Sequence, residues 1–91
     1  MSVTVHLPGI LSRHAGGARA LSASGSTVAE VLDAVEAGHP ELGRRIREAS
    51  DGATPFVTIY LNDEDVRFLG GRAAPVRPGD ELAIVSAIAG G

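Results

Sequence analysis

The most constraining feature of the sequence is one amphipathic helix that separates two groups of alternating segments. Thr27 and Glu30 have the spacing of a capping box: the threonine hydroxyl accepts from the Glu30 amide, and the glutamate side chain returns to the Thr27 amide. Apolar residues then recur at helical spacing, namely Val28, Val31, Leu32 and Val35. Gly38 is the expected residue just past the C-terminal end. Because this helix has a single apolar stripe, it can cover only one face of a sheet.

The segments on either side of the helix alternate apolar and polar residues, which is the pattern of half-buried strands. We expect strands over residues 3–7, 18–23, 56–61, 66–68 and 81–85, a loop over 9–17, a shorter helix over 40–49, a hairpin turn over 62–65 and a type II turn over 77–80. This order predicts an α+β fold with a mixed sheet and one main helix across one face. The last strand is apolar on both faces, so we expect it in the centre of the sheet.

The length of the chain limits the number of domains. Its 91 residues can bury one small core, so we expect one domain over residues 1–85 and a flexible tail over 86–91. Only Phe56, Tyr60 and Phe68 are aromatic, so the core must be aliphatic. No apolar run reaches membrane-spanning length and the N-terminus lacks a signal-peptide pattern, so a cytoplasmic location is expected.

Charge and residue types argue against several functional classes. A net charge of -3 argues against coating nucleic acid, which requires a basic surface. The sequence contains no cysteine and no lysine, which excludes thiolate metal sites, a cysteine nucleophile, a P-loop and a Schiff base. His6, His14 and His39 are too scattered to suggest a metal site, and no serine has a nucleophile motif. We therefore identify no candidate catalytic or metal-binding residues in the sequence.

Two charged clusters each have a functional and a structural interpretation. The acidic run Asp63–Asp65 could bind a cation, but it is more typical of a solvated hairpin turn. Arg44, Arg45 and Arg47 could contact an acidic partner. Neighbouring glutamates partly neutralise these arginines, so a solvated helix face is the simpler interpretation.

The end of the sequence is the remaining candidate site. The six residues from Ser86 to Gly91 reach at most about 20 Å from the sheet and are small apart from Ile88. Such a tail could thread a narrow channel and place the terminal carboxylate in a partner's pocket, although a frayed chain end would have the same composition. Glycine has no Cβ, so the carboxylate could approach an ATP α-phosphate closely. The carboxylate becomes an acyl donor only if another protein adenylates it.

Three segments carry a resemblance to a known family. These segments are residues 57–68, 78–85 and 87–91, and they include the asparagine-acidic hairpin and the strand that leads to Gly90-Gly91. They resemble the ubiquitin-like sulfur carriers of the ThiS/MoaD family. Residues 3–5 and 22–25 extend the similarity into the N-terminal half. The resemblance covers nearly the whole chain and implies a β-grasp fold, which agrees with the expected order of elements.

The resemblance also implies a chemistry. An E1-like adenylyltransferase and sulfurtransferase would activate the carboxyl group of Gly91 with ATP and magnesium, and a sulfur source would convert it to a thiocarboxylate. Gly90 would provide clearance, and partners would grip Ala87, Ile88 and Ala89. The carrier itself would be a co-substrate and not an enzyme, would bind no cofactor and would be a monomer when alone. The branch that it resembles supplies sulfur for cysteine, with a PLP-dependent cysteine synthase as acceptor enzyme and a metalloprotease that releases cysteine.

Other members of the family leave three alternatives open. The chain could be the small subunit of molybdopterin synthase, a carrier for a natural-product thioacid pathway, or a protein modifier. Without lysine it could not build lysine-linked chains on itself. Ser86 stands where related carriers often have proline, so the backbone before the tail is less restricted and the choice of partner is less certain.

Overall fold

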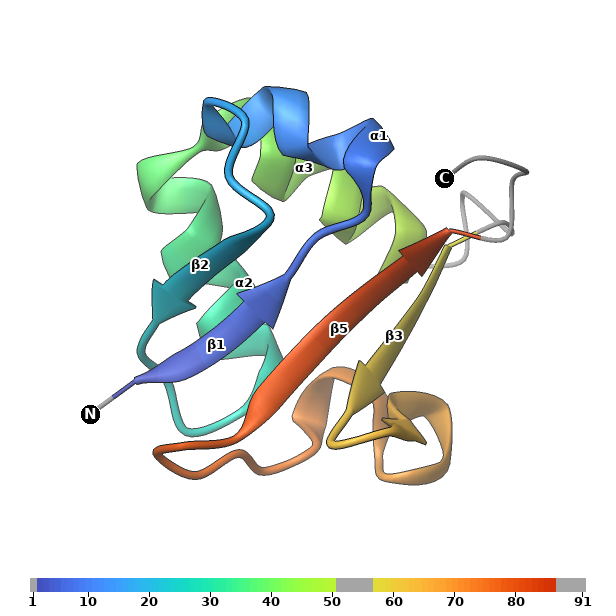
Figure 1. Ribbon diagram of the computed structural model, residues 1–91. Helices are drawn as coiled ribbons and strands as arrows, with labels where there is room; N and C mark the ends of the chain where they lie inside the picture. The colour runs from blue at the N-terminus through green and yellow to red at the C-terminus, as the bar shows by residue number, and fades with distance from the viewer. Residues whose placement is uncertain (1, 51–56, 87–91) are drawn as a thin grey trace.

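A mixed sheet with two helices packed on one face forms the body of the protein in a computed structural model that describes residues 2–50 and 57–86 (Figure 1). The elements are β1 (Val3–His6), α1 (Gly9–Ser12), a 3₁₀ turn (Arg13–Ala15), β2 (Ala20–Ala23), α2 (Val28–Gly38), α3 (Pro40–Ser50), β3 (Val57–Leu61), β4 (Glu64–Asp65), 3₁₀ turns at Val66–Phe68 and Gly71–Ala73, and β5 (Glu81–Ser86). The expected α+β class, with the main helix across one face, is confirmed.

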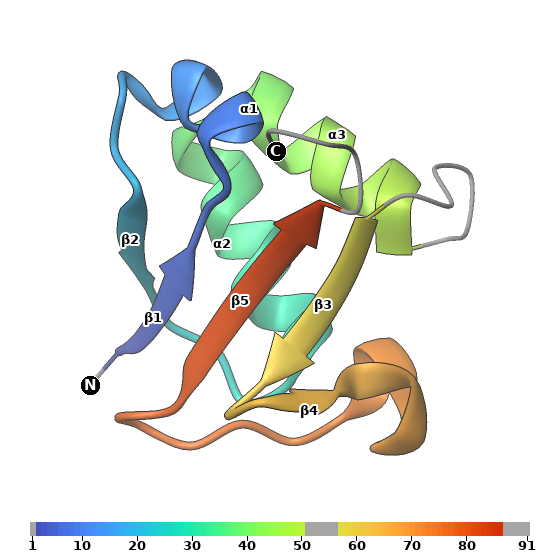
Figure 2. The same cartoon turned by 45° about the vertical axis from the view of Figure 1, so that its right-hand side comes forward.

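The sheet has five strands in the order β2-β1-β5-β3-β4. β5 pairs in parallel with β1 and antiparallel with β3, so the last strand is central, as expected from its apolar character. The two hairpins, β1 with β2 and β3 with β4, form the flanks. Figure 2 shows α2 and α3 on the same side of this sheet, which leaves the other face open.

The core lies between the sheet and the two helices and is aliphatic, as the shortage of aromatic residues requires. The apolar stripe of α2 is buried, with none of its four side chains more than 4% exposed: Val28, Val31, Leu32 and Val35. The sheet contributes Val3, Val5, Ile59, Leu61, Leu82 and Ile84, and Leu7, just after β1, is buried with them. Burying a side chain of this size contributes about 1.5–3 kcal/mol relative to leaving it in water, so the stripe is a main source of stability.

The segment expected as a loop over residues 9–17 is largely helical, so that prediction is wrong. α1 and the 3₁₀ turn form one short helical stretch that starts after Pro8, whose carbonyl accepts from the amides of Leu11 and Ser12 at 3.0 and 3.1 Å. Leu11 and Ala15 are buried in the common core. Two apolar residues four apart give too short a pattern to predict a helix, and burial in the core stabilises the stretch.

The second hairpin is tighter than expected, because its returning strand is Glu64–Asp65 and not residues 66–68. Asn62 and Asp63 have φ values of 50° and 72° and form a two-residue turn, a conformation that asparagine and aspartate tolerate. The next residues then form a 3₁₀ turn, capped by the Asp65 carboxylate, which accepts from the Arg67 amide at 2.9 Å. The expected hairpin is present, but the strand over 66–68 is not.

The start of α2 departs from a full capping box. The Thr27 hydroxyl accepts from the Glu30 amide at 3.2 Å as predicted, but the Glu30 carboxylate accepts from the amide of Ser26, at 2.9 Å, and not from that of Thr27. Thr27 forms a β-bridge with Pro75, which sets the direction of the chain before the helix.

The end of α2 also differs from the prediction. Gly38 is the last helical residue, without the positive φ of a glycine cap. His39 ends the helix with φ near -141°, and α3 begins at Pro40 as expected.

A glycine that sequence reasoning did not single out sets the approach of α2 and α3. A Cβ placed on Gly43 would lie 2.2 Å from the Cβ and 2.4 Å from the Cα of Glu36 in α2. Contacts this short are not possible between carbon atoms, so only glycine allows the two helices to cross at this distance. Leu42 and Ile46 on the same helix are then fully buried.

We predict that Gly43→Ala destabilises the protein by about 1–3 kcal/mol, the usual cost of overpacking, despite the gain in helix propensity. Gly38→Ala is the matched control, because nothing lies within 4 Å of its added Cβ and its φ is not positive. That change should be neutral or raise stability by up to about 1 kcal/mol. Urea denaturation measures the free energy of unfolding of both variants and the wild type. Equal values for G43A and the wild type would show that α2 and α3 can move apart without a loss of stability.

Candidate functional site

The predicted tail lies outside the described residues. This applies to the predicted attachment residue, Gly91, and to the predicted partner-binding residues Ala87, Ile88, Ala89 and Gly90. What the structure describes is the point from which that tail departs. β5 extends one residue further than expected, to Ser86, which pairs with Val57 of β3. The end of β5 is therefore the described part of the candidate site.

β5 is held by β1 near its start and by β3 over most of its length. Its residues pair with β1 from Glu81 to Ala83 and with β3 from Leu82 to Ser86. Leu82 is fully buried and Ile84 is 3% exposed, so the inner face of the strand is anchored in the core. The chain consequently reaches Ser86 while still paired with β3, and a partner that approaches this end meets a defined surface.

A hydrogen-bond network fixes the other end of β5. The Asp80 carboxylate accepts from the Arg77 amide at 2.8 Å and from Asn62 Nδ2 at 3.1 Å, while Asn62 Oδ1 accepts from the Glu81 amide at 3.0 Å. Gly79, with φ of 92°, and the Asp80 amide bonded to the Arg77 carbonyl confirm the predicted type II turn. The network ties the β3–β4 hairpin to the start of β5.

These hydrogen bonds favour the ionised form of the Asp80 carboxyl group. Donation from the Arg77 amide, and then from the Asn62 side chain, lowers the pKa of the Asp80 carboxyl below its ordinary value of 3.8. Sequence reasoning did not identify Asn62 and Asp80 as partners. Eighteen positions separate them, and their pairing depends on β3 and β5 being neighbours in the sheet.

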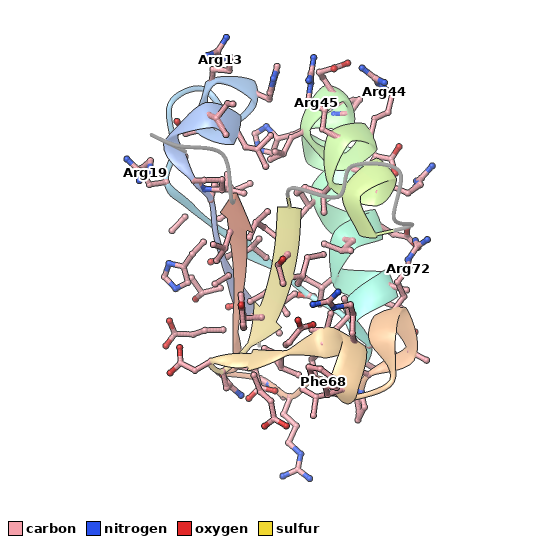
Figure 3. The ribbon with its side chains drawn as sticks, turned by 90° about the vertical axis from the view of Figure 1, so that its right-hand side faces the viewer. Arg13, Arg19, Arg44, Arg45, Phe68 and Arg72 are labelled. Carbon is pink, nitrogen blue, oxygen red and sulfur yellow. The ribbon has the colours of Figure 1, made fainter. Side chains whose placement is uncertain are left out.

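The surface around the end of β5 combines apolar and basic groups. Ile10 on α1 and Val85 on the open face of β5 are 39% and 43% exposed. Arg13 and Arg19 flank α1, and Arg19 Nε donates to the Leu7 carbonyl at 3.2 Å. Figure 3 shows both arginines, together with Arg44 and Arg45 of α3, projecting from the end of the molecule where β5 finishes.

Charged side chains in the hairpin and in α3 form ion pairs with their neighbours, while Arg44 and Arg45 stay exposed. Asp65 binds the Arg67 side chain, with 2.7 Å between Oδ2 and Nη2, and this bond lowers the pKa of its carboxyl. Glu41 accepts from Arg44 Nη2 at 2.6 Å and from Arg45 Nε at 2.8 Å, and its pKa is also lowered, chiefly by Arg44. Arg47 pairs with Glu36 of α2.

No group of three or more histidine or acidic side chains gathers to hold a metal within residues 2–50 and 57–86. His6 lies on the open face of the sheet, as expected from the phase of β1, with its Nε2 atom 2.6 Å from Glu81 Oε1. In this part of the chain, no helix has the length and apolar character needed to cross a membrane.

Comparison with known proteins agrees with this arrangement. The model of the ThiS family matches residues 5–91. The chain belongs to the ThiS family. It is 44% identical to the sulfur carrier protein CysO of Mycobacterium tuberculosis over the full length of both chains. The crystal structure of M. tuberculosis CysO superposes with a TM-score of 0.83 at 42% identity, covering 94% of this chain and 99% of that one.

Two further structures resemble this ThiS-family chain. One is in the crystal structure of the Amycolatopsis orientalis BexX/CysO complex, with a TM-score of 0.82 and 43% identity over 98% of this chain and 99% of that one. The other is the small archaeal modifier protein 1 of Methanosarcina acetivorans, with a TM-score of 0.79 and 28% identity over 99% and 96% of the two chains. The predicted β-grasp, ubiquitin-like fold is thereby confirmed.

The Asp80 network predicts a dependence of stability on pH. Because the pKa of Asp80 is lowered in the folded state, its ionised form stabilises the fold above about pH 4, and this contribution is lost as the pH falls below 3.8 through the folded-state pKa. Asp80→Asn should reduce stability at pH 7 and show a smaller further loss between pH 5 and pH 3 than the wild type. Urea midpoints at the three pH values provide the measurement.

Asp63→Asn is the matched control for this prediction. Asp63 lies in the neighbouring hairpin turn, and its side chain makes no hydrogen bond within the described segments. The loss of stability of D63N on acidification should follow that of the wild type. An identical pH profile for D80N and wild type would contradict a stabilising role for the Asp80 carboxylate.

Proposed function

We propose that this protein is a sulfur carrier whose Gly91 carboxyl group is adenylated, converted to a thiocarboxylate and used to donate sulfur in cysteine biosynthesis. The observation that carries the proposal is the full-length similarity to CysO, at 44% identity. The match to the ThiS family extends through residue 91, so the proposed attachment residue lies inside the matched region.

Two steps would charge the carboxyl group, and both need a partner enzyme. In the first, a Gly91 carboxylate oxygen attacks the α-phosphorus of ATP, pyrophosphate leaves and an acyl adenylate forms. In the second, sulfur from a donor attacks the carbonyl carbon and AMP leaves, so that one oxygen of the carboxylate is replaced by sulfur. The carrier would supply only the carboxylate, and the partner would bind ATP and magnesium.

The described body suits a carrier because it is small and rigid and places the start of the tail in a central strand. β5 is paired on both sides and anchored by buried Leu82 and Ile84. The five residues that follow Ser86 can extend at most about 18 Å. A partner's active site must therefore open close to the end of β5 if Gly91 is to reach it.

The proposed partners follow from the relatives. The Amycolatopsis orientalis structure contains CysO in a complex with BexX, which supports a carrier that acts by binding another protein. For this chain we propose an E1-like adenylyltransferase and sulfurtransferase, a PLP-dependent cysteine synthase that accepts the sulfur, and a metalloprotease that releases cysteine. The carrier would be a monomer between these encounters.

A second candidate function is that of a protein modifier, which the similarity to small archaeal modifier protein 1 supports at 28% identity. A modifier and a carrier share the adenylation step and differ in the nucleophile that attacks the adenylate. Amine attack would attach Gly91 to a target protein, whereas attack by sulfur would give the thiocarboxylate. Self-linked chains through lysine are excluded, because the sequence has no lysine.

The mass of the intact protein tests the carrier function. We expect that incubation with ATP, magnesium, sulfide and the E1-like adenylyltransferase encoded in the same genome raises the mass by one oxygen-to-sulfur exchange, located on Gly91 by fragmentation. No change in mass with an enzyme that hydrolyses ATP in the presence of this carrier would contradict the proposal. Conjugates of higher mass in cells that depend on Gly91 would favour the modifier.

A variant that ends at Ala89 is the control. Its thermal unfolding curve should match that of the full chain, because the core and the network around β5 are complete without the last two residues. It should form no thiocarboxylate. A large loss of stability in this variant would mean that the terminal glycines have a structural role and would weaken the carrier proposal.

A further inference from the structure

We propose that a basic rim around the end of β5, formed by Arg13, Arg19, Arg44 and Arg45, binds an acidic protein surface at the entrance to the partner's active site. The inference rests on the proposed function, because it assigns the surface that a partner meets when it takes Gly91. Electrostatic attraction at this rim would accelerate encounter and orient the carrier with its tail toward the partner.

Covalent geometry forces a partner to contact this end of the body. Five residues after Ser86 span at most about 18 Å, and any channel that receives the tail uses part of that length. The protein surface around the channel entrance must therefore lie against the groups that surround the end of β5. Figure 3 shows that the four arginines of the basic rim project at this end, where β5 finishes and β3 begins.

The chain brings the rim together from three separate segments. Arg13 lies in the 3₁₀ turn after α1, Arg19 precedes β2, and Arg44 and Arg45 lie in α3. The parallel pairing of β1 with β5 carries α1 to the end of the sheet where β5 finishes. Contacts between α3 and the 3₁₀ turn at Arg13–Ala15 place the two basic segments side by side.

The rim carries a surplus of positive charge. All four arginines are exposed, and Glu41 binds both Arg44 and Arg45, so that one carboxylate is shared by two guanidinium groups. Arg13 makes no side-chain hydrogen bond or ion pair within the described part of the chain, so its charge is open to a partner. Arg19 is held in place, since its Nε donates to the Leu7 carbonyl and its Nη1 lies 3.9 Å from the position of a Cβ on Gly9.

The opposite end of the sheet has the opposite charge. Five carboxylates lie in the β3–β4 hairpin and at the start of β5, namely Asp63, Glu64, Asp65, Asp80 and Glu81. Arg67 and Arg77 balance only part of this charge. Positive and negative charge are thus separated along β5. Such a charge distribution orients a protein so that its basic end faces an acidic surface. An acidic protein patch, and not a nucleic acid, is the occupant, because the rim surrounds the strand that leads to Gly91 and on the proposed function this tail enters a protein active site.

Matched charge reversals at the two ends test the inference. Arg13→Glu removes a rim charge, and Arg77→Glu makes the same change at the opposite end, where the Arg77 side chain also has no hydrogen bond or ion pair in the described residues. Association rates with the adenylyltransferase of the mass experiment are measured by stopped flow at low ionic strength. We expect R13E to lower the association rate about five-fold or more and R77E to change it less than about two-fold.

Ionic strength and a neutral variant complete the test. At about 0.5 M salt, where the Debye length is only about 4 Å, the rates of R13E and wild type should converge. Arg13→Gln should fall between them at low salt, and thermal unfolding verifies that each variant is folded. Equal effects of R13E and R77E, or a wild-type rate that does not fall with added salt, would overturn the inference. Because the wild-type mass shift is measured separately, these outcomes would leave the proposed carrier function standing.

Discussion

The fold depends on β5, a strand that is hydrogen-bonded to β1 on one side and β3 on the other while its inner side chains pack beneath α2 and α3. Leu82 and Ile84 connect both halves of the chain in one core. If β5 were removed, the β1–β2 and β3–β4 hairpins would share no strand, and a lone hairpin has little stability in water. The stability of the whole protein thus depends on the strand that leads directly to the candidate tail.

The same strand links stability to the proposed function. On the proposed function the carrier would need no catalytic groups, because the partner would supply ATP, magnesium and the sulfur donor. It needs a body that does not deform when the tail is gripped. Pairing on both edges, the buried inner face and the Asn62–Asp80 network at its start all restrain β5. The rigid body then determines which surface a partner meets around the tail.

Charge gives the two ends of β5 different roles. The acidic groups near its start are largely used within the structure: Asp80 closes a turn, Asp65 caps the 3₁₀ turn after the hairpin, and Glu81 pairs with His6. At the other end, four exposed arginines surround the strand that leads to the candidate tail. This position, close to the tail that a partner must receive, is why we assign the basic end, and not the acidic hairpin, to recognition.

Local patterns in the sequence determined most of the elements. The stripe from Val28 to Val35 specified α2 and its buried face, and Pro40 specified the start of α3. The apolar character of residues 81–85 specified the central strand. Each of these signals depends on near neighbours in the chain. The resemblance of the C-terminal third pointed to the family, and the assignment of Gly91 still rests on it. Tertiary structure decided the features that depend on distant contacts. Burial of Leu11 and Ala15 makes residues 9–15 helical, and Gly43 meets Glu36 only where two helices cross. The basic rim forms only when β1 and β5 align in parallel. Periodicity along a chain reports which face of an element is buried, but it contains no information about which elements become neighbours, and these three features depend on neighbours.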